Sequence, residues 1–157
     1  MIGILPVSNE TKLTATFEVP YEAGELKAVG LRDTTVIGTK MLKTTGAASK
    51  IRLTPDRATI NADRNDLSYV MVELTDDAGN LIPDSDLPVT FEVFGAGETA
   101  AIGSANPSDM RSFKSPVCTT FRGRCLVILR PTGRKGEMTL TAKASGLGIE
   151  TTRIVAK

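Results

Sequence analysis

The stretch that decides the fold class is SKIRLTPDRATINADRNDLSYVMVELTDDAGNLIP, from Ser49 to Pro83. Within it, Val70, Val72 and Leu74 recur at a period of two, the pattern of a half-buried strand. The sequence DDAGN at 76–80 then ends this strand with residues that tolerate positive φ and hydrogen-bond to their own backbone. Short strands at this spacing, separated by Pro, Gly, Asn and Asp, are typical of an Ig-like β-sandwich.

The composition is that of a folded, non-membrane domain with no electrostatic bias. Of the 157 residues 41% are hydrophobic and 24% are charged, and the formal net charge is +1. The charges are of mixed sign along the chain, so we expect no nucleic-acid partner and no membrane partner. No apolar run approaches the length that spans a bilayer.

Ahead of the deciding stretch, the chain carries too few strand patterns for a closed sandwich. Three alternating segments are expected as strands, at 13–19, 26–31 and 36–42, and the small polar residues 44–48 read as a linker. A sandwich of this type has about seven strands. We therefore predict an all-β chain: residues 1–47 as the trailing half of an Ig-like domain, and 48–157 as a complete Ig-like β-sandwich.

The rest of the second part continues the strand pattern. Further strands are expected at 89–93, 99–102, 138–144 and 151–155, and a long polar loop at 103–114. Segments 117–121 and 124–130 are predicted to form a hairpin about Arg122-Gly123. In that register Cys125 would lie opposite Thr120, and Cys118 would be too far off for a disulfide. Both cysteines are therefore expected as free, buried thiols.

Residues that could carry catalysis or bind a metal are scarce. Histidine is absent, which removes the commonest general base and most transition-metal sites. The carboxylates fall in turns or on outward strand positions, where the split pKa values of an acid–base pair do not arise. The Asp-rich loop DDAGNLIPDSD at 76–86 does not match an EF-hand and reads as a turn. We expect no catalytic residue, no cofactor and no metal.

The aromatic residues give only weak binding candidates. Phe17, Phe91 and Phe121 lie on inward strand faces and are expected in the core. Exposed rings could stack on a sugar or contact another domain. Three residues are candidates for that role: Tyr21, Tyr69 and Phe113.

Two stretches resemble bacterial family 2 glycoside hydrolases of the β-galactosidase type. TFEVPYEAGELKAVG (16–30) followed by LKTTG (42–46) resembles the end of the Ig-like domain behind the catalytic barrel. The stretch from 49, with VTFEVFGAG (89–97) and FRGRCLVIL (121–129), resembles the C-terminal Ig-like domain. The family's two catalytic glutamates lie in the barrel, which has no counterpart in this sequence, so none is carried over. Two loops depart from the family pattern, at 63–65 and at Arg122.

The resemblance implies a non-catalytic C-terminal accessory region of a glycoside hydrolase, from a periplasmic, cell-surface or secreted bacterial parent. Its implied roles are packing on upstream domains, extending an active-site rim, or oligomerisation. The alternative is an Ig-like repeat of a cell-surface adhesin, because the D-x-G-N-x-x-P signature at 77–83 also occurs in such repeats.

The apolar residues of 1–46 would be exposed in a half sandwich. They include Leu13, Ala15, Phe17, Val19, Leu26, Ala28, Val36 and Met41. We predict that these residues are covered by a second copy in a homodimer through 1–46. Docking of the same strands onto the chain's own second sandwich is the alternative.

Overall fold

A computed structural model describes residues 2–157. The chain divides into two compact units, Met1–Thr44 and Thr45–Lys157. Over the described residues the secondary structure is β-strand, turn and irregular chain. Those residues contain no helix long and apolar enough to cross a membrane.

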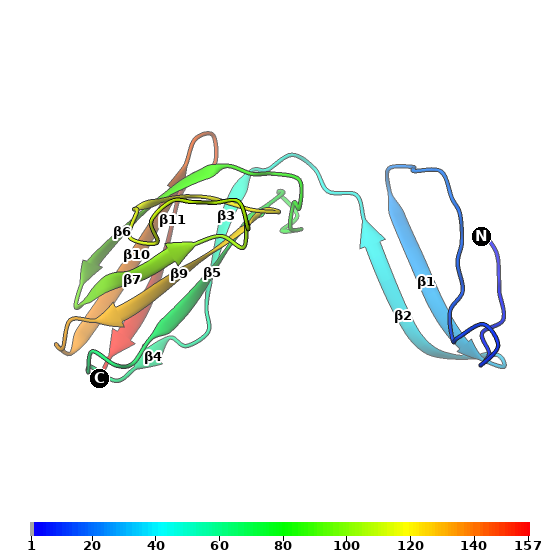
Figure 1. Cartoon of the computed structure of the whole chain (residues 1–157), viewed down its shortest axis with the longest axis horizontal. Helices are drawn as coiled ribbons and strands as arrows, with labels where there is room; N and C mark the ends of the chain where they lie inside the picture. The colour runs from blue at the N-terminus through cyan, green and yellow to red at the C-terminus, as the bar shows by residue number, and fades with distance from the viewer. Residues whose placement is uncertain (1) are drawn as a thin grey trace. The chain divides into compact units, whose positions relative to one another are not determined.

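The first unit is built on one antiparallel hairpin of two strands, β1 (Glu25–Arg32) and β2 (Thr35–Lys43) (Figure 1). Asp33 takes a positive φ of 56° in the tight turn between them, a conformation that Asp tolerates better than most residues. At the open end, the backbone N–H of Thr44 donates to the carbonyl of Gly24 at 2.8 Å. These two strands match the expected segments 26–31 and 36–42.

The expected strand at 13–19 does not form. Lys12 and Leu13 have positive φ values of 53° and 56° at the end of a turn, and residues 14–24 have no strand partner. Alternation in this segment marks apolar faces, but a strand also needs a neighbouring backbone to bond with. The first unit therefore has a two-stranded sheet and not a three-stranded one. Phe17, predicted as core, is exposed.

The apolar residues of the hairpin do not share one face. Because Leu26 pairs with Leu42 and Lys27 pairs with Met41, Leu26 and Met41 point to opposite sides. A bulge at the turn end then places Val36 opposite Leu31. Both faces of the hairpin carry apolar side chains, and none of residues 2–44 is buried.

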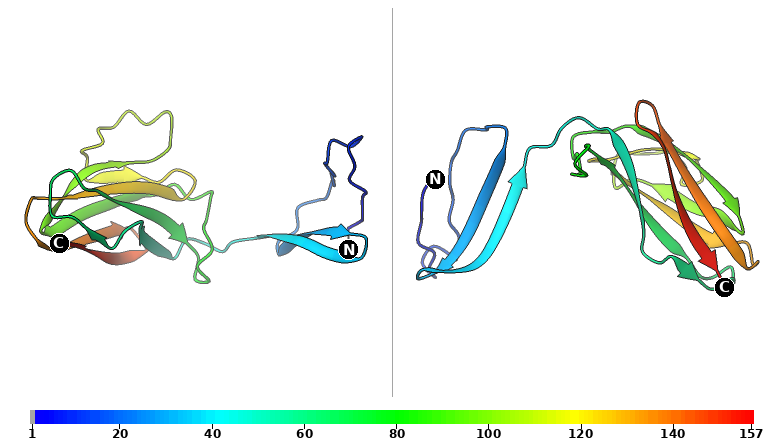
Figure 2. Two further views of the ribbon diagram at one scale, coloured as in Figure 1. Left: turned by 90° about the horizontal axis from the view of Figure 1, so that it is seen from below. Right: turned by 180° about the vertical axis from the view of Figure 1, so that it is seen from behind.

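The second unit is a sandwich of two sheets that lie face to face (Figure 2). The five-stranded sheet contains, in spatial order, β4 (Thr59–Ile60), β11 (Gly148–Ala156), β10 (Gly136–Ala144), β6 (Pro88–Gly95) and β8 (Val117–Thr119). The four-stranded sheet contains β3 (Lys50–Pro55), β5 (Ser68–Thr75), β9 (Arg124–Pro131) and β7 (Gly97–Gly103). All pairings are antiparallel except that of β4 with β11. The all-β, Ig-like sandwich prediction is confirmed.

The inward residues of both sheets form one core. Val70, Val72 and Leu74 of β5 are fully buried, as their spacing predicts, and they face Met138 and Leu140 from β10 in the same cluster. Every buried apolar side chain among the described residues belongs to this second unit. Phe91 is in the core as expected, whereas Phe121 is only partly buried.

The predicted hairpin at 117–130 is wrong in its pairing. Phe121 and Arg124 do bridge across a two-residue turn, with positive φ at Arg122 (52°) and Gly123 (72°). Beyond this bridge the chain separates: β8 pairs with β6 in one sheet, and β9 pairs with β5 and β7 in the other. A two-residue turn favours a hairpin, but here the inward side chains on both arms belong to opposite walls of the core.

Candidate functional site

The outer face of the four-stranded sheet carries a continuous row of apolar side chains. Strand register places Tyr69 of β5 opposite Ile128 of β9, which in turn lies opposite Ala101 of β7. In the next row, Met71 lies opposite Leu126. Directly paired residues share a face, and their neighbours along each strand (Val70 and Val127) are fully buried, so these side chains point outward.

Phe113 extends this row from a loop. The loop between β7 and β8 projects from the sandwich (Figure 2) and returns along the edge of β7, where the N–H of Ile102 donates to the carbonyl of Phe113 at 2.8 Å. The ring packs on Gly103, because a Cβ at that glycine would lie 2.9 Å from two ring carbons. Gly103 pairs with Leu126, so the ring joins the second row.

We call this surface the apolar face. It consists of Tyr69, Met71, Ala101, Phe113, Leu126 and Ile128. Tyr69 is 41% exposed, Met71 39% and Phe113 65%, while the others are partly buried. A contiguous outward set of this kind differs from single scattered apolar residues, and it is characteristic of surfaces that contact other protein.

Two ion-pair clusters flank the apolar face along the strands. At one end Glu73 accepts from Arg52 Nη2 at 2.7 Å and from Arg124 Nε at 3.0 Å. At the other end Glu98 Oε1 accepts from Arg130 Nε at 2.7 Å and from Arg64 Nη2 at 2.8 Å. Each cluster joins two arginines to one carboxylate, so both ends carry an excess positive charge.

These carboxylates are suited to ion pairing and not to proton transfer. Partial burial would raise the pKa of Glu73, but hydrogen bonds from Arg52 and Arg124 outweigh it and the pKa is lowered. The pKa of Glu98 is also lowered, chiefly by its hydrogen bond from Arg130. Both groups therefore stay ionised near neutral pH, whereas a general acid needs a raised pKa.

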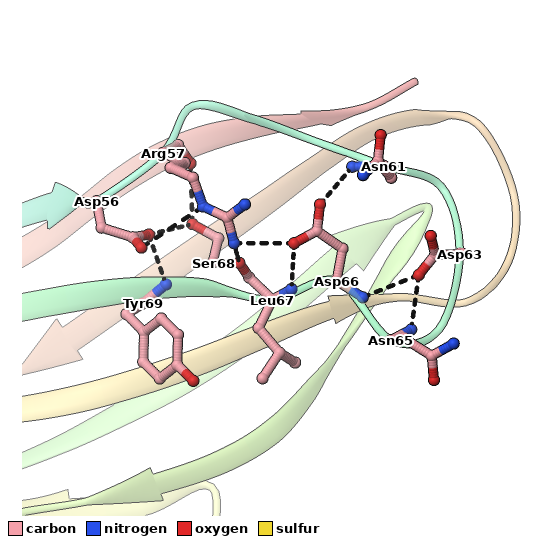
Figure 3. A network of polar contacts seen from close by, with 9 residues as sticks. All are labelled: Asp56, Arg57, Asn61, Asp63, Asn65, Asp66, Leu67, Ser68 and Tyr69. Carbon is pink, nitrogen blue, oxygen red and sulfur yellow. Dashed lines mark hydrogen bonds and ion pairs between the residues drawn. The ribbon is translucent and has the colours of Figure 1, made fainter.

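A polar network fixes the start of the strand that carries Tyr69 (Figure 3). Asp56 Oδ1 accepts from the N–H of Tyr69 at 2.8 Å, and Asp66 Oδ1 accepts from Arg57 Nη2 at 2.9 Å. The pKa of Asp66 is lowered, first by the N–H of Asn61 and then by Arg57. In Figure 3 the ring of Tyr69 points away from the Arg57 guanidinium. The network thus holds the backbone and leaves the ring free for contact.

The structure brings two of the three sequence candidates onto one surface. Tyr69 and Phe113 both lie on the apolar face, with β9 between them; strands two apart are about 10 Å from each other. Tyr21 lies in the first unit, is 82% exposed, and has its hydroxyl 3.4 Å from Thr44 Oγ1.

Sequence reasoning missed Met71, Leu126 and Ile128. The signal was present in CLVIL at 125–129, an uninterrupted apolar run that puts large side chains on both faces of β9. A strand solvated on one side would alternate with polar residues instead.

The Asp-rich loop after β5 uses its first carboxylate within the protein. Asp76 accepts from the N–H of Asn80 at 2.8 Å, from Asn80 Nδ2 at 3.0 Å and from the N–H of Gly46 at 3.2 Å. These bonds, led by the Asn80 side chain, lower the pKa of Asp76 to about 2. Among residues 2–157, no group of three or more carboxylate, Cys or His ligands converges on a point.

Comparison with known proteins identifies the family. Residues 51–153 match the family described as glycoside hydrolase family 2 C-terminal domain 5. The chain belongs to this family. The match covers most of the sandwich, including the apolar face.

Family 2 relatives are much longer than this chain. It is 39% identical over 135 residues to the beta-galactosidase BoGH2A of Bacteroides ovatus, a match that covers 86% of the chain and 16% of that protein. A crystal structure of a glycosyl hydrolase family 2 member from Bacteroides cellulosilyticus matches 99% of the chain with a TM-score of 0.96 and 35% identity. The chain covers 20% of that structure. This glycoside hydrolase family 2 domain is therefore a small part of the relatives it matches.

For the alternative of an adhesin repeat, the comparisons show a similar fold and no more. The D0–D1 domains of intimin match 68% of the chain with a TM-score of 0.51 and 14% identity. Identity at that level shows a shared Ig-like sandwich and nothing of function.

Proposed function

We propose that this chain is the non-catalytic C-terminal part of a β-galactosidase-like glycoside hydrolase. The observation that carries the proposal is the 39% identity to a beta-galactosidase of which the chain covers only 16%. Glu73 and Glu98, the carboxylates beside the apolar face, are held in ion pairs with arginine. Catalysis would then belong to other domains of the parent.

An assay with chromogenic β-galactosides and related aryl glycosides tests this proposal. The chain alone should give no turnover above the buffer rate. Turnover that is abolished by substitution of one of its own carboxylates, such as Glu73→Gln, would overturn the non-catalytic assignment.

For the domain organisation, we propose that residues 1–47 are the trailing half of an Ig-like domain and 48–157 the complete C-terminal domain. Support comes from the first unit, where large side chains remain exposed on both faces of the β1–β2 hairpin. An isolated two-stranded hairpin is marginally stable in water, so this unit needs a cover. In the parent, upstream domains would supply it.

In the isolated chain the cover would be a second copy, giving a homodimer through residues 1–46. The face of the hairpin that carries Val29 and Met41 is suited to an isologous contact, because both side chains are diagonal neighbours and about half exposed. Completing the burial of a half-exposed large side chain is worth about 1 kcal/mol, half of its full transfer value. In a symmetric dimer each substitution acts twice, so two substitutions remove about 4 kcal/mol, or roughly a thousandfold in Kd.

A matched pair of double variants tests the dimer. Val29→Ser with Met41→Ser removes apolar surface, whereas Lys27→Ser with Thr39→Ser changes the cross-strand partners on the same face and keeps that surface. Sedimentation velocity over a concentration series should show a large loss of association in the first and little change in the second. Equal loss in both, or none in the first, would count against a contact through this face.

The apolar face offers a second contact surface. We propose that Tyr69 and Phe113 contact another domain of the parent there, and that Tyr21 belongs to the covered surface of the first unit. The excess arginine at both ends of the apolar face favours a partner with an acidic rim. Substituting Tyr69 and Phe113 with Ser should lower the melting temperature of the full-length parent and change that of the isolated chain by only a few degrees. Equal shifts in melting temperature for the parent and the isolated chain would contradict the contact.

A further inference from the structure

The two cysteines face each other from opposite sheets. Cys118 of β8 pairs with the buried Val89, and Cys125 of β9 pairs with the buried Val72, so both thiols point into the core. Both are free and buried. The Cys118 thiol donates to the carbonyl of Thr119 at 3.6 Å, and each of the two thiols is the largest influence on the pKa of the other. Although only six residues separate them in sequence, the two cysteines lie in opposite sheets of the sandwich.

A small cavity with a mixed polar and apolar lining reaches Cys118 from the loop side. It has a volume of about 50 Å³, and its lining includes Ser104, Asp109, Arg111, Phe113 and Cys118. One water needs roughly 10–15 Å³ of such space, so a two-oxygen solute fits and a peptide thiol does not. The hydroxyl of Ser104 is buried in this wall, and the group it acts on there is the Cys118 sulfur.

The charges around Cys118 favour its thiolate. The pKa of Cys118 is lowered to about 7, chiefly by hydrogen bonding with Cys125. The Arg111 guanidinium and the Ser104 hydroxyl lower it further, whereas burial and the Asp109 carboxylate raise it. Arg111 itself is held by Asp109 at 2.7 Å and by Thr119 Oγ1 at 2.9 Å. The pKa of the Cys125 thiol is strongly raised, first by its hydrogen bond with Cys118 and then by burial. The cavity lining includes Cys118 and not Cys125, so Cys118 is the sulfur that a small solute can reach, and its surroundings favour the thiolate.

We propose that Cys118 is a peroxide-reactive thiol and that Cys125 resolves its oxidised form into a disulfide linking the two sheets. The cavity admits hydrogen peroxide and excludes larger disulfides such as oxidised glutathione. An inter-sheet disulfide is compatible with a sandwich of this kind, because antibody domains carry one between facing strands. Here it would tie the short edge strand β8 to the central strand β9.

The chemistry balances with hydrogen peroxide as the only oxidant. The Cys118 thiolate attacks one peroxide oxygen, the O–O bond breaks, and the departing hydroxide takes up a proton to become water. Cys118 is then a sulfenic acid. Cys125 loses its proton and attacks the Cys118 sulfur, the S–O bond breaks, and a second water leaves. Two thiols are oxidised by two electrons, and one peroxide is reduced to two waters.

Intact-mass spectrometry after peroxide treatment tests the proposal. The native chain should lose the mass of two hydrogen atoms and both titratable thiols, with the link inside one chain on a non-reducing gel. The Cys125→Ala variant should instead gain the mass of one oxygen at Cys118, which a dimedone reagent traps once the oxidised chain is unfolded in denaturant, and the Cys118→Ala variant should stay unoxidised. Two thiols remaining in the native chain, or a disulfide between chains, would overturn the proposal.

Alkylation at neutral pH gives a second readout that does not need the disulfide to form. A thiol with a pKa near 7 is half ionised there, whereas an ordinary one is ionised by a few per cent, so Cys118 should react more than about tenfold faster than Cys125. The preference should vanish in denaturant, and Arg111→Gln should slow Cys118 in the folded chain. Equal rates in the folded chain, with the variants shown to be folded by circular dichroism, would contradict the assignment.

Discussion

Substitution of Thr120 by valine should destabilise the sandwich, although valine has the same shape. Thr120 is fully buried where the chain leaves β8, and its Oγ1 accepts from the N–H of Leu87 at 2.9 Å and donates to the carbonyl of Ser85 at 3.1 Å. Valine fills the same space but leaves both backbone groups without their partner. An unsatisfied buried polar group costs about 1–3 kcal/mol.

Leu87 and Ser85 are themselves only partly buried, so water offsets some of this loss and a total of about 2 kcal/mol is expected. For a sandwich that spans Thr45–Lys157, each kcal/mol shifts the melting temperature by about 4 °C. Differential scanning calorimetry should therefore show the Thr120→Val transition roughly 8 °C below that of the native chain.

Thr120→Ser is the matched control, because it keeps the hydroxyl and removes one methyl group. Loss of a single buried methyl group costs about 1 kcal/mol, so the serine variant should be more stable than the valine variant. A valine variant as stable as the native chain would refute the view that the hydroxyl holds the Ser85–Leu87 segment against β8.

Further expectations concern pH, a turn glycine and the linker. The pKa of Asp76 is about 2 in the folded state and near 4 in an unfolded chain, so its stabilising contribution is complete above pH 4 and is lost as pH falls towards 2. The Asp76→Asn variant should therefore lose less stability than the native chain between pH 4 and pH 2. Melting temperatures that fall in parallel for the two chains over this range would contradict the role of Asp76. Gly123→Ala should lower the urea midpoint of the chain far more than Gly148→Ala. Both glycines have positive φ, but only at Gly123 would a Cβ lie 2.1 Å from the carbonyl oxygen of Ile82. Similar midpoints for the two variants would argue against this packing. Limited proteolysis should cut within 44–49 and release a stable fragment, whereas early cleavage inside β5 would count against that boundary.

Most of the sandwich could be predicted from the sequence because its strands bury one face against a partner sheet. Val70, Val72 and Leu74 are such a set, and the glycines at 95 and 97 mark a turn that the structure contains. In both places local conformation and burial impose the same pattern, so either one suffices to locate the element.

The errors arise where pairing or sheet assignment depends on distant parts of the chain. Residues 13–19 alternate as a strand does, yet no neighbouring backbone pairs with them. The turn at Arg122-Gly123 was recognised correctly, but whether its arms stay together is decided by β6 and β5, which are far away in sequence. The prediction of free cysteines agrees with the structure for a different reason than the register assumed.

The apolar face could be only half predicted for a related reason. Tyr69 and Phe113 were identified as exposed aromatic residues, but Phe113 reaches the sheet through a loop whose path no periodicity encodes. Met71 became recognisable only after strand register placed it opposite Leu126.

The central claim is that the first unit must be covered by other protein. The most direct test is the molecular mass in solution of the chain with and without that unit. Light scattering coupled to gel filtration at micromolar concentration should give twice the chain mass for residues 1–157 and the monomer mass for residues 45–157. The amides of Glu25–Lys43 should be protected from hydrogen exchange in the dimer, because an uncovered hairpin opens readily. A monomer mass for the whole chain, with those amides still protected, would contradict the dimer and point to cover from within the chain.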